Sequence, residues 1–310
     1  MVSLLDIRST FKGMIKLGEP LANYASLGIG GPADYLFAPS TRDDFVSVIT
    51  QLRASGIPFL FAGRGSNLLV SDRGYHGAAI VLESGFSGIR LERAGSGEAL
   101  VFAAAGVRLA ALVQFAIEHG LQGVETLAGI PGTVGGLAVG NATAAIPLPG
   151  GCLVRVEILR DNDVLVVSDA PERFSFRRSG IGRDVVLGVV FRLGQGDREQ
   201  LMRARRQILV RRNAEQPLNV ANAGMMFRDP PGRKAAELIQ HAGMRGARRG
   251  NAMVSERHAN LLLNLGKATA VDALGLMTEV QHAVRDKAGV QLGLAMRLAG
   301  FEEELLREVA

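Results

Sequence analysis

Two glycine-rich segments carry the residue types that could bind a phosphate. The first, "GRGSN" at residues 63–67, follows the apolar segment "IPFLFA", and the second, "GIPGTVGG", occupies residues 129–136. Small residues let backbone N–H groups approach an anion, and serine and asparagine side chains add further donors. A tight turn in a packed core gives the same pattern. Two such segments in one chain favour an extended diphosphate ligand.

Neither segment is a standard nucleotide-binding motif. The first lacks the Lys-Ser/Thr pair of a P-loop and the third glycine of a Rossmann fingerprint. In the second, Gly129, Pro131, Gly132, Gly135 and Gly136 predict that no stable helix interior forms. Such a segment can instead follow an extended cofactor closely.

A third segment, "ANAGMMFRDPPG" at residues 221–232, resembles a polar turn that contains two adjacent methionines. Methionine fills irregular gaps in cores, so ordinary packing is one interpretation of Met225 and Met226. The other interpretation is that a functional position has been changed.

The elements around these segments are predicted from apolar spacing and from helix-end signals. Residues 41–56 predict a helix with Thr41 as N-cap and Gly56 as its end, and residues 107–120 predict a helix ended by Gly120. Strands are predicted at residues 57–62, 78–82 and 99–105.

The pattern becomes strand-rich from residue 153, with "LVRVEILR", "DVLVVS" and "DVVLGVVFRL", and a turn at 161–163. A basic helix is predicted at residues 197–212. Helices at 233–242 and near 269–288 and a strand at 259–265 follow. We therefore place a domain boundary near residue 195.

Composition excludes several classes of protein. Hydrophobic residues make up 47% and charged residues 21%, which suits a packed globular chain. The net charge of +5 suits an anionic ligand, but scattered arginines and the absence of tryptophan argue against a nucleic-acid stacking surface. The single cysteine, Cys152 at a predicted strand start, cannot form an intrachain disulfide. With no signal peptide or membrane span, we expect a cytoplasmic protein.

Several motifs in order resemble one family. They are "GIGGPADYLFAPST", "GRGSNLLVSDRGYHG", "GIPGTVGG", "FRRS", "RRNAEQP", "GMMFRDPPG", "AELIQHAGMRG" and "VSERHANLLLN". Together they resemble the UDP-N-acetylenolpyruvoylglucosamine reductases, known as MurB, over residues 20–301. The compact spacing is similar to the shorter class of that family.

The resemblance implies an α+β flavoprotein of the vanillyl-alcohol-oxidase (PCMH) type. Residues 1–195 would form a two-lobed FAD-binding domain with a lobe boundary near residue 70. Residues 196–288 would form a C-terminal α/β substrate domain, and residues 289–310 a returning segment. In the family, NADPH reduces FAD, and the flavin then reduces UDP-N-acetylenolpyruvylglucosamine to UDP-N-acetylmuramate, a peptidoglycan precursor. A monomer that binds a nucleotide sugar or a related anionic small molecule is expected, without nucleic acid, metal or membrane insertion.

The resemblance also assigns roles residue by residue. The FAD-binding residues would be Gly63, Gly65, Ser66, Asn67, Gly129, Ile130, Gly132, Thr133 and Asn141. The substrate-binding residues would be Arg211, Arg228, Asp229, Arg245 and His258. Arg177 matches the family's active-site arginine, which can stabilise negative charge that develops on the substrate.

The departures from the family pattern fall mainly where the chemistry takes place. Met225 occupies the position of the serine that donates a proton, and methionine has no proton to give. Ala295 occupies the position of an active-site glutamate, and Asp229 that of an asparagine. A carboxylate at Asp229 would repel a substrate pyrophosphate. Smaller departures are Gly28, Thr143 and Phe176, where the family has a basic residue, glycine and tyrosine.

Three hypotheses remain open at this point. The first is a working reductase with a substitute proton donor, such as Ser255, Glu256, His258 or water. The second is a regulatory or binding flavoprotein that has lost the reaction. The third is a flavin oxidoreductase that acts on another substrate. We favour an FAD-binding protein with a weakened or lost family reaction, since losing a positioned proton donor typically costs ~10²–10⁴ in rate.

Overall fold

The computed structural model of the chain describes residues 11–82, 86–95, 97–140, 152–168, 174–175, 178–179, 184–215 and 220–309. The chain forms two compact units. Unit 1 comprises residues 1–15, 37–63 and 80–212, and unit 2 comprises residues 16–36, 64–79 and 213–310. The strands β1 (Met14–Pro20), β2 (Pro32–Ala38) and β5 (Tyr75–Val81) carry the chain from one unit to the other and belong to a sheet of order β1-β2-β5-β3.

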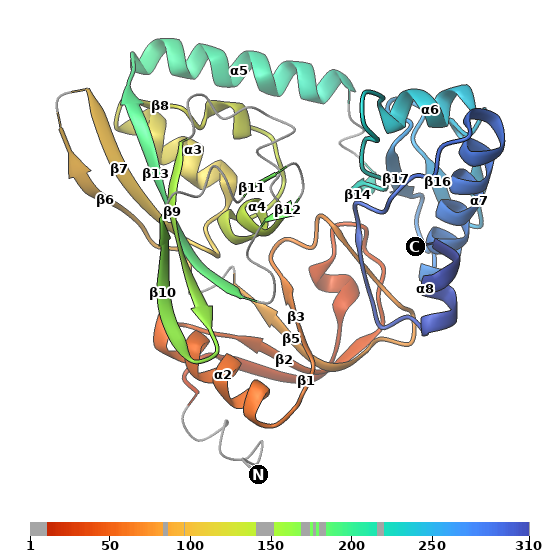
Figure 1. Cartoon of the computed structure of the whole chain (residues 1–310), viewed down its shortest axis with the longest axis horizontal. Helices are drawn as coiled ribbons and strands as arrows, with labels where there is room; N and C mark the ends of the chain where they lie inside the picture. The colour runs from red at the N-terminus through yellow and green to blue at the C-terminus, as the bar shows by residue number, and fades with distance from the viewer. Residues whose placement is uncertain are drawn as a thin grey trace. The chain divides into compact units, whose positions relative to one another are not determined.

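Unit 1 is built on a sheet of order β10-β9-β13-β7-β6, and β8 adds to β13 (Figure 1). Its strands are β3 (Phe59–Ala62), β6 (Ile89–Ala94), β7 (Glu98–Ala104), β8 (Leu121–Gln122), β9 (Leu153–Arg160), β10 (Asp163–Ser168), β11 (Phe174–Ser175), β12 (Arg178–Ser179) and β13 (Val185–Gln195). Its helices are α2 (Arg42–Ala54), α3 (Leu109–Glu118), η2 (Glu125–Leu127), α4 (Val134–Gly140) and α5 (Arg198–Glu215).

Unit 2 contains a second sheet of order β14-β17-β16-β15 and a parallel pair of β4 and β18. Its strands are β4 (Leu68–Val70), β14 (Ala221–Met225), β15 (Arg248–Arg249), β16 (Ala252–Val254), β17 (Leu261–Asn264) and β18 (Arg297–Ala299). Its helices are η1 (Leu21–Tyr24), α6 (Ala235–His241), α7 (Ala270–Ala288) and α8 (Glu303–Val309). One apolar core joins α6, α7 and the sheet, with Phe227, Leu276 and Met277 fully buried.

The predicted helix at residues 41–56 and its ends are confirmed. Thr41 Oγ1 accepts a hydrogen bond from Asp44 N at 3.1 Å, which caps α2. Gly56 follows the helix with φ +65°, a conformation that costs glycine little. The strand predicted from Leu153 to Arg160 and the helix predicted near residues 269–288 are also confirmed as β9 and α7.

Two predictions about backbone conformation are wrong. Residues 134–140 form helix α4 although Gly135 and Gly136 lie in it. A Cβ on Gly135 would lie 2.9 Å from Ala105 Cβ, and Gly135 N donates to Ala105 O at 2.8 Å. Close packing on Ala105, directly after β7, therefore outweighs the low helix propensity of glycine. Residues 221–225, expected in a polar turn, form strand β14, because pairing with β17 buries Ala223.

The predicted domain boundaries near residues 70, 195 and 288 stay predictions. Cys152 immediately precedes β9, as predicted, and is buried. None of the described helices is long and apolar enough to cross a bilayer.

The capping box of α7 makes the stability of the fold depend on pH. Asp272 and Thr269 exchange side-chain to backbone hydrogen bonds of 3.0 Å each, and the bond from Thr269 N is the largest cause lowering the pKa of Asp272. A lowered pKa stabilises the fold above the ordinary carboxyl pKa, and this stabilisation is lost as pH falls through the folded-state value.

We therefore expect Asp272→Asn to lower the free energy of unfolding by a few tenths of a kcal/mol at neutral pH, because the carboxylate is solvent-exposed. As pH falls below the ordinary carboxyl range, the difference from the original protein should shrink, since Asp272 takes up a proton as the pH approaches its lowered pKa. Urea unfolding at several pH values measures this. Asp286→Asn, at the other end of α7, is the control, and an equal pH dependence in both variants would contradict the assignment.

Candidate functional site

In unit 1 the end of β3 meets the start of α4. A Cβ on Gly63 would lie 2.9 Å from Thr133 Oγ1, so only a glycine fits without displacing the threonine. Thr133 is 3% exposed, and its Oγ1 accepts a hydrogen bond from Gly136 N at 3.3 Å. Gly129 and Gly132 have φ values of +75° and +149°. The two predicted glycine segments therefore contact each other through Gly63 and Thr133.

In unit 2 the residues Gly65, Ser66 and Asn67 are held by backbone hydrogen bonds. Gly65 has φ +56°, and a Cβ there would collide with Tyr24 O. Gly65 O accepts hydrogen bonds from Ser26 N at 3.2 Å and Ser26 Oγ at 3.3 Å, and Ser66 O accepts one from Gly224 N at 2.6 Å. The loop is therefore fixed against the strand that ends at Met225.

The structure places Met225 and Ala295 on two hydrogen-bonded segments of unit 2. Ala295 N donates to Met226 O at 2.8 Å, and Phe227 and Leu294 form an antiparallel bridge. Asn67 Nδ2 donates to Ala295 O at 2.8 Å, and Asn67 O accepts from Arg297 N at 2.9 Å. Ala295 and Asn67 are therefore hydrogen-bonded to each other, and Ala295 is bonded to the residue that follows Met225.

Asn260 holds the backbone after Met225, a role that the sequence motifs did not indicate. Its Oδ1 accepts a hydrogen bond from Phe227 N at 3.0 Å, and its Nδ2 donates to Phe227 O at 2.8 Å. Asn260 is 1% exposed and Phe227 is 0% exposed. An asparagine directly before the apolar run "LLL" was the available signal, because a buried amide needs partners.

The predicted substrate-binding residues of unit 2 occupy three places. Arg228 and Asp229 follow β14 and are exposed, and Asp229 Oδ1 accepts from Ala235 N at 2.8 Å, at the start of α6. Arg245 donates from Nε to Glu256 O. His258 Nδ1 accepts from Asn260 N at 3.4 Å. The helix N-terminus partly offsets the charge of the Asp229 carboxylate, which weakens the repulsion expected from it.

The remaining predicted residues are distributed as follows. Arg211 is exposed on α5 in unit 1, and Ile130 is half-buried beside Gly129. Arg177 and Asn141, together with Phe176 and Thr143, lie outside the described residues.

Ser255, one of the candidate substitute donors, lies beside the strand pair that carries Met225. Ser255 N donates to Leu261 O at 2.9 Å, and Leu261 is the register partner of Met225. Ser255 is 1% exposed, and its hydroxyl accepts hydrogen bonds from Arg257 N at 3.2 Å and His258 N at 3.3 Å. This geometry explains the turn at residues 255–258, because the hydroxyl replaces a backbone acceptor.

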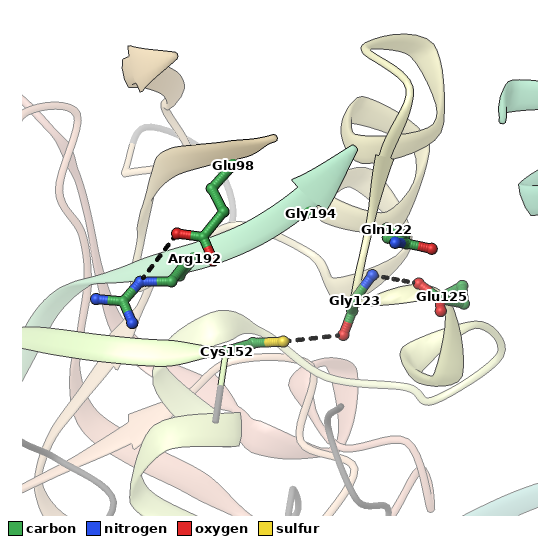
Figure 2. Close-up of a pocket in the computed structure, with 7 residues that line it drawn as sticks. All are labelled: Glu98, Gln122, Gly123, Glu125, Cys152, Arg192 and Gly194. Carbon is green, nitrogen blue, oxygen red and sulfur yellow. Dashed lines mark hydrogen bonds and ion pairs between the residues drawn. The ribbon is translucent and has the colours of Figure 1, made fainter. Parts of the chain in front are cut away.

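A pocket of about 340 Å³ in unit 1 contains none of the predicted site residues (Figure 2). It is lined by Glu98, Gln122, Gly123, Glu125, Cys152, Arg192 and Gly194. Its polar groups contact one another. Gly123 N donates to Glu125 Oε2 at 2.6 Å, and Glu98 Oε2 lies 3.8 Å from Arg192 Nε. Burial, and secondarily the charge of Glu125, raise the pKa of the Cys152 thiol, which disfavours the nucleophilic thiolate.

Comparison with known proteins assigns the chain to a family. Residues 216–299 match the model of the UDP-N-acetylenolpyruvoylglucosamine reductase C-terminal domain, and residues 33–160 match that of an FAD binding domain. The reductase of Syntrophus aciditrophicus is 35% identical over 95% of both chains, and that of Pelobacter propionicus is 39% identical over 94% of this chain and 97% of its own. The chain belongs to the UDP-N-acetylenolpyruvoylglucosamine reductase family.

A crystal structure of a member of this family agrees with the fold. The reductase of Thermus caldophilus superimposes with a TM-score of 0.76 at 33% identity, covering 93% of this chain and 99% of that one. The resemblance seen in the motifs and the α+β fold class are thereby confirmed.

The two hydrogen bonds between the Asn260 side chain and the Phe227 backbone, called the Asn260 clamp, should stabilise the fold. Asn260→Ala removes two hydrogen bonds from a buried peptide, so we expect the free energy of unfolding to fall by about 2–4 kcal/mol. Chemical denaturation measures this. Asn213→Ala, at an exposed position of α5, is the matched control and should change little. Equal effects of the two substitutions would show that the clamp contributes no stability.

Proposed function

We propose that this chain is a flavoprotein that binds FAD, accepts electrons from NADPH and carries out the family's second half-reaction weakly or not at all. FAD, when bound, supplies hydride transfer between NADPH and an enolpyruvyl substrate. The ligand of the substrate domain is proposed to be the family's nucleotide sugar or a related anionic small molecule. A monomeric state and a cytoplasmic location belong to the same proposal.

The glycine segments fit an FAD diphosphate in their donor chemistry. Gly129 and Gly132 have backbone conformations that disfavour other residues, and Gly63 has no room for a side chain beside Thr133. Backbone N–H groups in such segments can approach phosphate oxygens closely. The residues Gly63, Gly65, Ser66, Asn67, Gly129, Ile130, Gly132, Thr133 and Asn141 remain the proposed FAD-binding set.

The observation that carries the proposal is the hydrogen bond from Ala295 N to Met226 O. Reduction of an enolpyruvyl double bond needs a proton donor as well as a hydride. The bond joins the segment of Ala295 to the residue that follows Met225, which supports the proposal that both groups are missing from one site. Neither a thioether nor a methyl group can donate a proton. Arg177 is proposed to retain its role of stabilising negative charge on the substrate.

Ser255 supports a second candidate function, that of an active reductase with a substitute donor. Its backbone is bonded to Leu261, the partner of Met225, which places a hydroxyl next to the altered segment. Its burial and its two accepted hydrogen bonds oppose this role, because a proton donor has to reach the substrate. We therefore rank it second.

Restoring the missing groups tests the proposal. We expect Met225→Ser combined with Ala295→Glu to speed reoxidation of reduced flavin by UDP-N-acetylenolpyruvylglucosamine by at least ~10², because a proton donor is then available. The reoxidation rate is followed anaerobically after reduction with dithionite, so that reduction by NADPH is tested separately. Met202→Ser, on the exposed face of α5, is the matched control.

Two outcomes would contradict the proposal. An original protein that reoxidises as fast as the double variant would show that no donor is missing. If Ser255→Ala then abolished that fast reoxidation, the second candidate function would replace the first.

A further inference from the structure

Arg212, near the end of α5, lies against Gly129 of the second glycine segment. A Cβ on Gly129 would lie 2.9 Å from Arg212 Cδ and 3.8 Å from Arg212 Nε. Both residues belong to unit 1. Gly129 also has φ +75°, so the position suits glycine for two independent reasons.

The two neighbouring arginines of α5 have different surroundings. Arg212 shares a helix face with Leu209, whose Cδ2 would lie 3.0 Å from a Cβ on Gly129. The Arg212 Nε atom is buried. Arg211, one residue earlier, is exposed. The helix therefore directs the stem of Arg212, and not that of Arg211, onto the glycine segment.

The charge of the chain is concentrated on this helix. α5 contains six arginines and two glutamates, a net charge of +4 in a chain whose net charge is +5. Two of these arginines have partners elsewhere on the surface. Arg203 forms an ion pair with Glu199 at 3.1 Å, and Arg205 Nη1 donates a hydrogen bond to Gln114 Oε1 at 2.5 Å. The positive potential next to Gly129 favours an anion there.

We propose that the Arg212 guanidinium binds the diphosphate of the cofactor at the second glycine segment. The inference rests on the proposed FAD binding and assigns a role to a residue outside the predicted cofactor set. Guanidinium presents a planar set of donors that matches phosphate oxygens, and it remains charged at all accessible pH values. Burial of Nε places the group where the dielectric constant is lower than in water, which strengthens its attraction to an anion.

A purely structural role for Arg212 makes different predictions. Its aliphatic stem could serve only to pack on Gly129, or its charge could serve only to stabilise the carbonyl end of α5. In the first case a residue with a similar unbranched stem replaces it fully. In the second case Arg211, which is at the same end of the helix, contributes equally to stability.

The experiment compares Arg212→Met with Arg211→Met in the full-length protein. Methionine keeps an unbranched apolar stem and removes the charge. The apoprotein is titrated with FAD, and the dissociation constant is measured at several salt concentrations. Phosphorus NMR of the bound FAD reports directly on the two phosphates, and thermal unfolding reports on the fold.

We expect Arg212→Met to raise the FAD dissociation constant at least about tenfold, to reduce its salt dependence and to shift the phosphate resonances. With no substrate present, Arg211→Met should leave the resonances unchanged, because Arg211 belongs to the predicted substrate-binding residues and not to the cofactor set. Arg212→Lys should lie between the original protein and Arg212→Met, because it restores charge without the planar donors. If Arg212→Met fails to fold, the comparison of Arg212→Lys with Arg211→Lys answers the same question through the phosphate resonances.

The outcomes separate this inference from the proposed function. If the original apoprotein does not bind FAD, the proposed function fails, and the inference fails with it. If the original protein binds FAD and Arg212→Met binds it equally well with unchanged phosphate resonances, the inference alone is overturned. Equal losses of affinity in the Arg211 and Arg212 variants would also overturn it, since a general effect of helix charge would then suffice.

Discussion

The constraint on which the candidate site depends is that the returning C-terminal segment bonds to two distant parts of unit 2 at once. Its residue Ala295 donates to Met226 O and accepts from Asn67 Nδ2, and the strand that follows pairs in parallel with β4. The buried amide of Asn260 fixes the facing peptide at Phe227. Because the backbone provides most of these bonds, the geometry does not require serine at residue 225 or glutamate at residue 295. The framework can therefore persist while the chemistry it positions is lost.

Much of the local structure follows from sequence because it depends on local signals. Helix α2 begins after a threonine cap and stops shortly before a glycine, and both signals are independent of distant residues. Strand β9 is a continuous run that contains three β-branched residues and is bounded by turn residues. The family could also be predicted, because its motifs occur in order along almost the whole chain. The positions of Met225 and Ala295 in that pattern predicted a shared site, and the structure places them on bonded segments.

The remaining features depend on contacts that sequence spacing does not contain. Apart from Met225, strand β14 is made of small and polar residues, so the burial of Ala223 appears only once β17 is beside it. Helix α4 forms despite its glycines because the absence of side chains allows close packing on Ala105. Arg211 and Arg212 are equivalent as a basic pair in sequence. They differ only in the folded helix, where Arg212 packs on Gly129 and Arg211 is exposed.

The most direct test of the account is a single-turnover experiment on the unaltered protein under anaerobic conditions. The spectrum of the bound flavin is recorded, NADPH is added, and UDP-N-acetylenolpyruvylglucosamine follows. The account predicts that the flavin binds, becomes reduced and then stays reduced or reoxidises very slowly, with little UDP-N-acetylmuramate detected by mass spectrometry. Rapid reoxidation with one equivalent of product per flavin would contradict it, because a proton donor would then be present despite Met225 and Ala295.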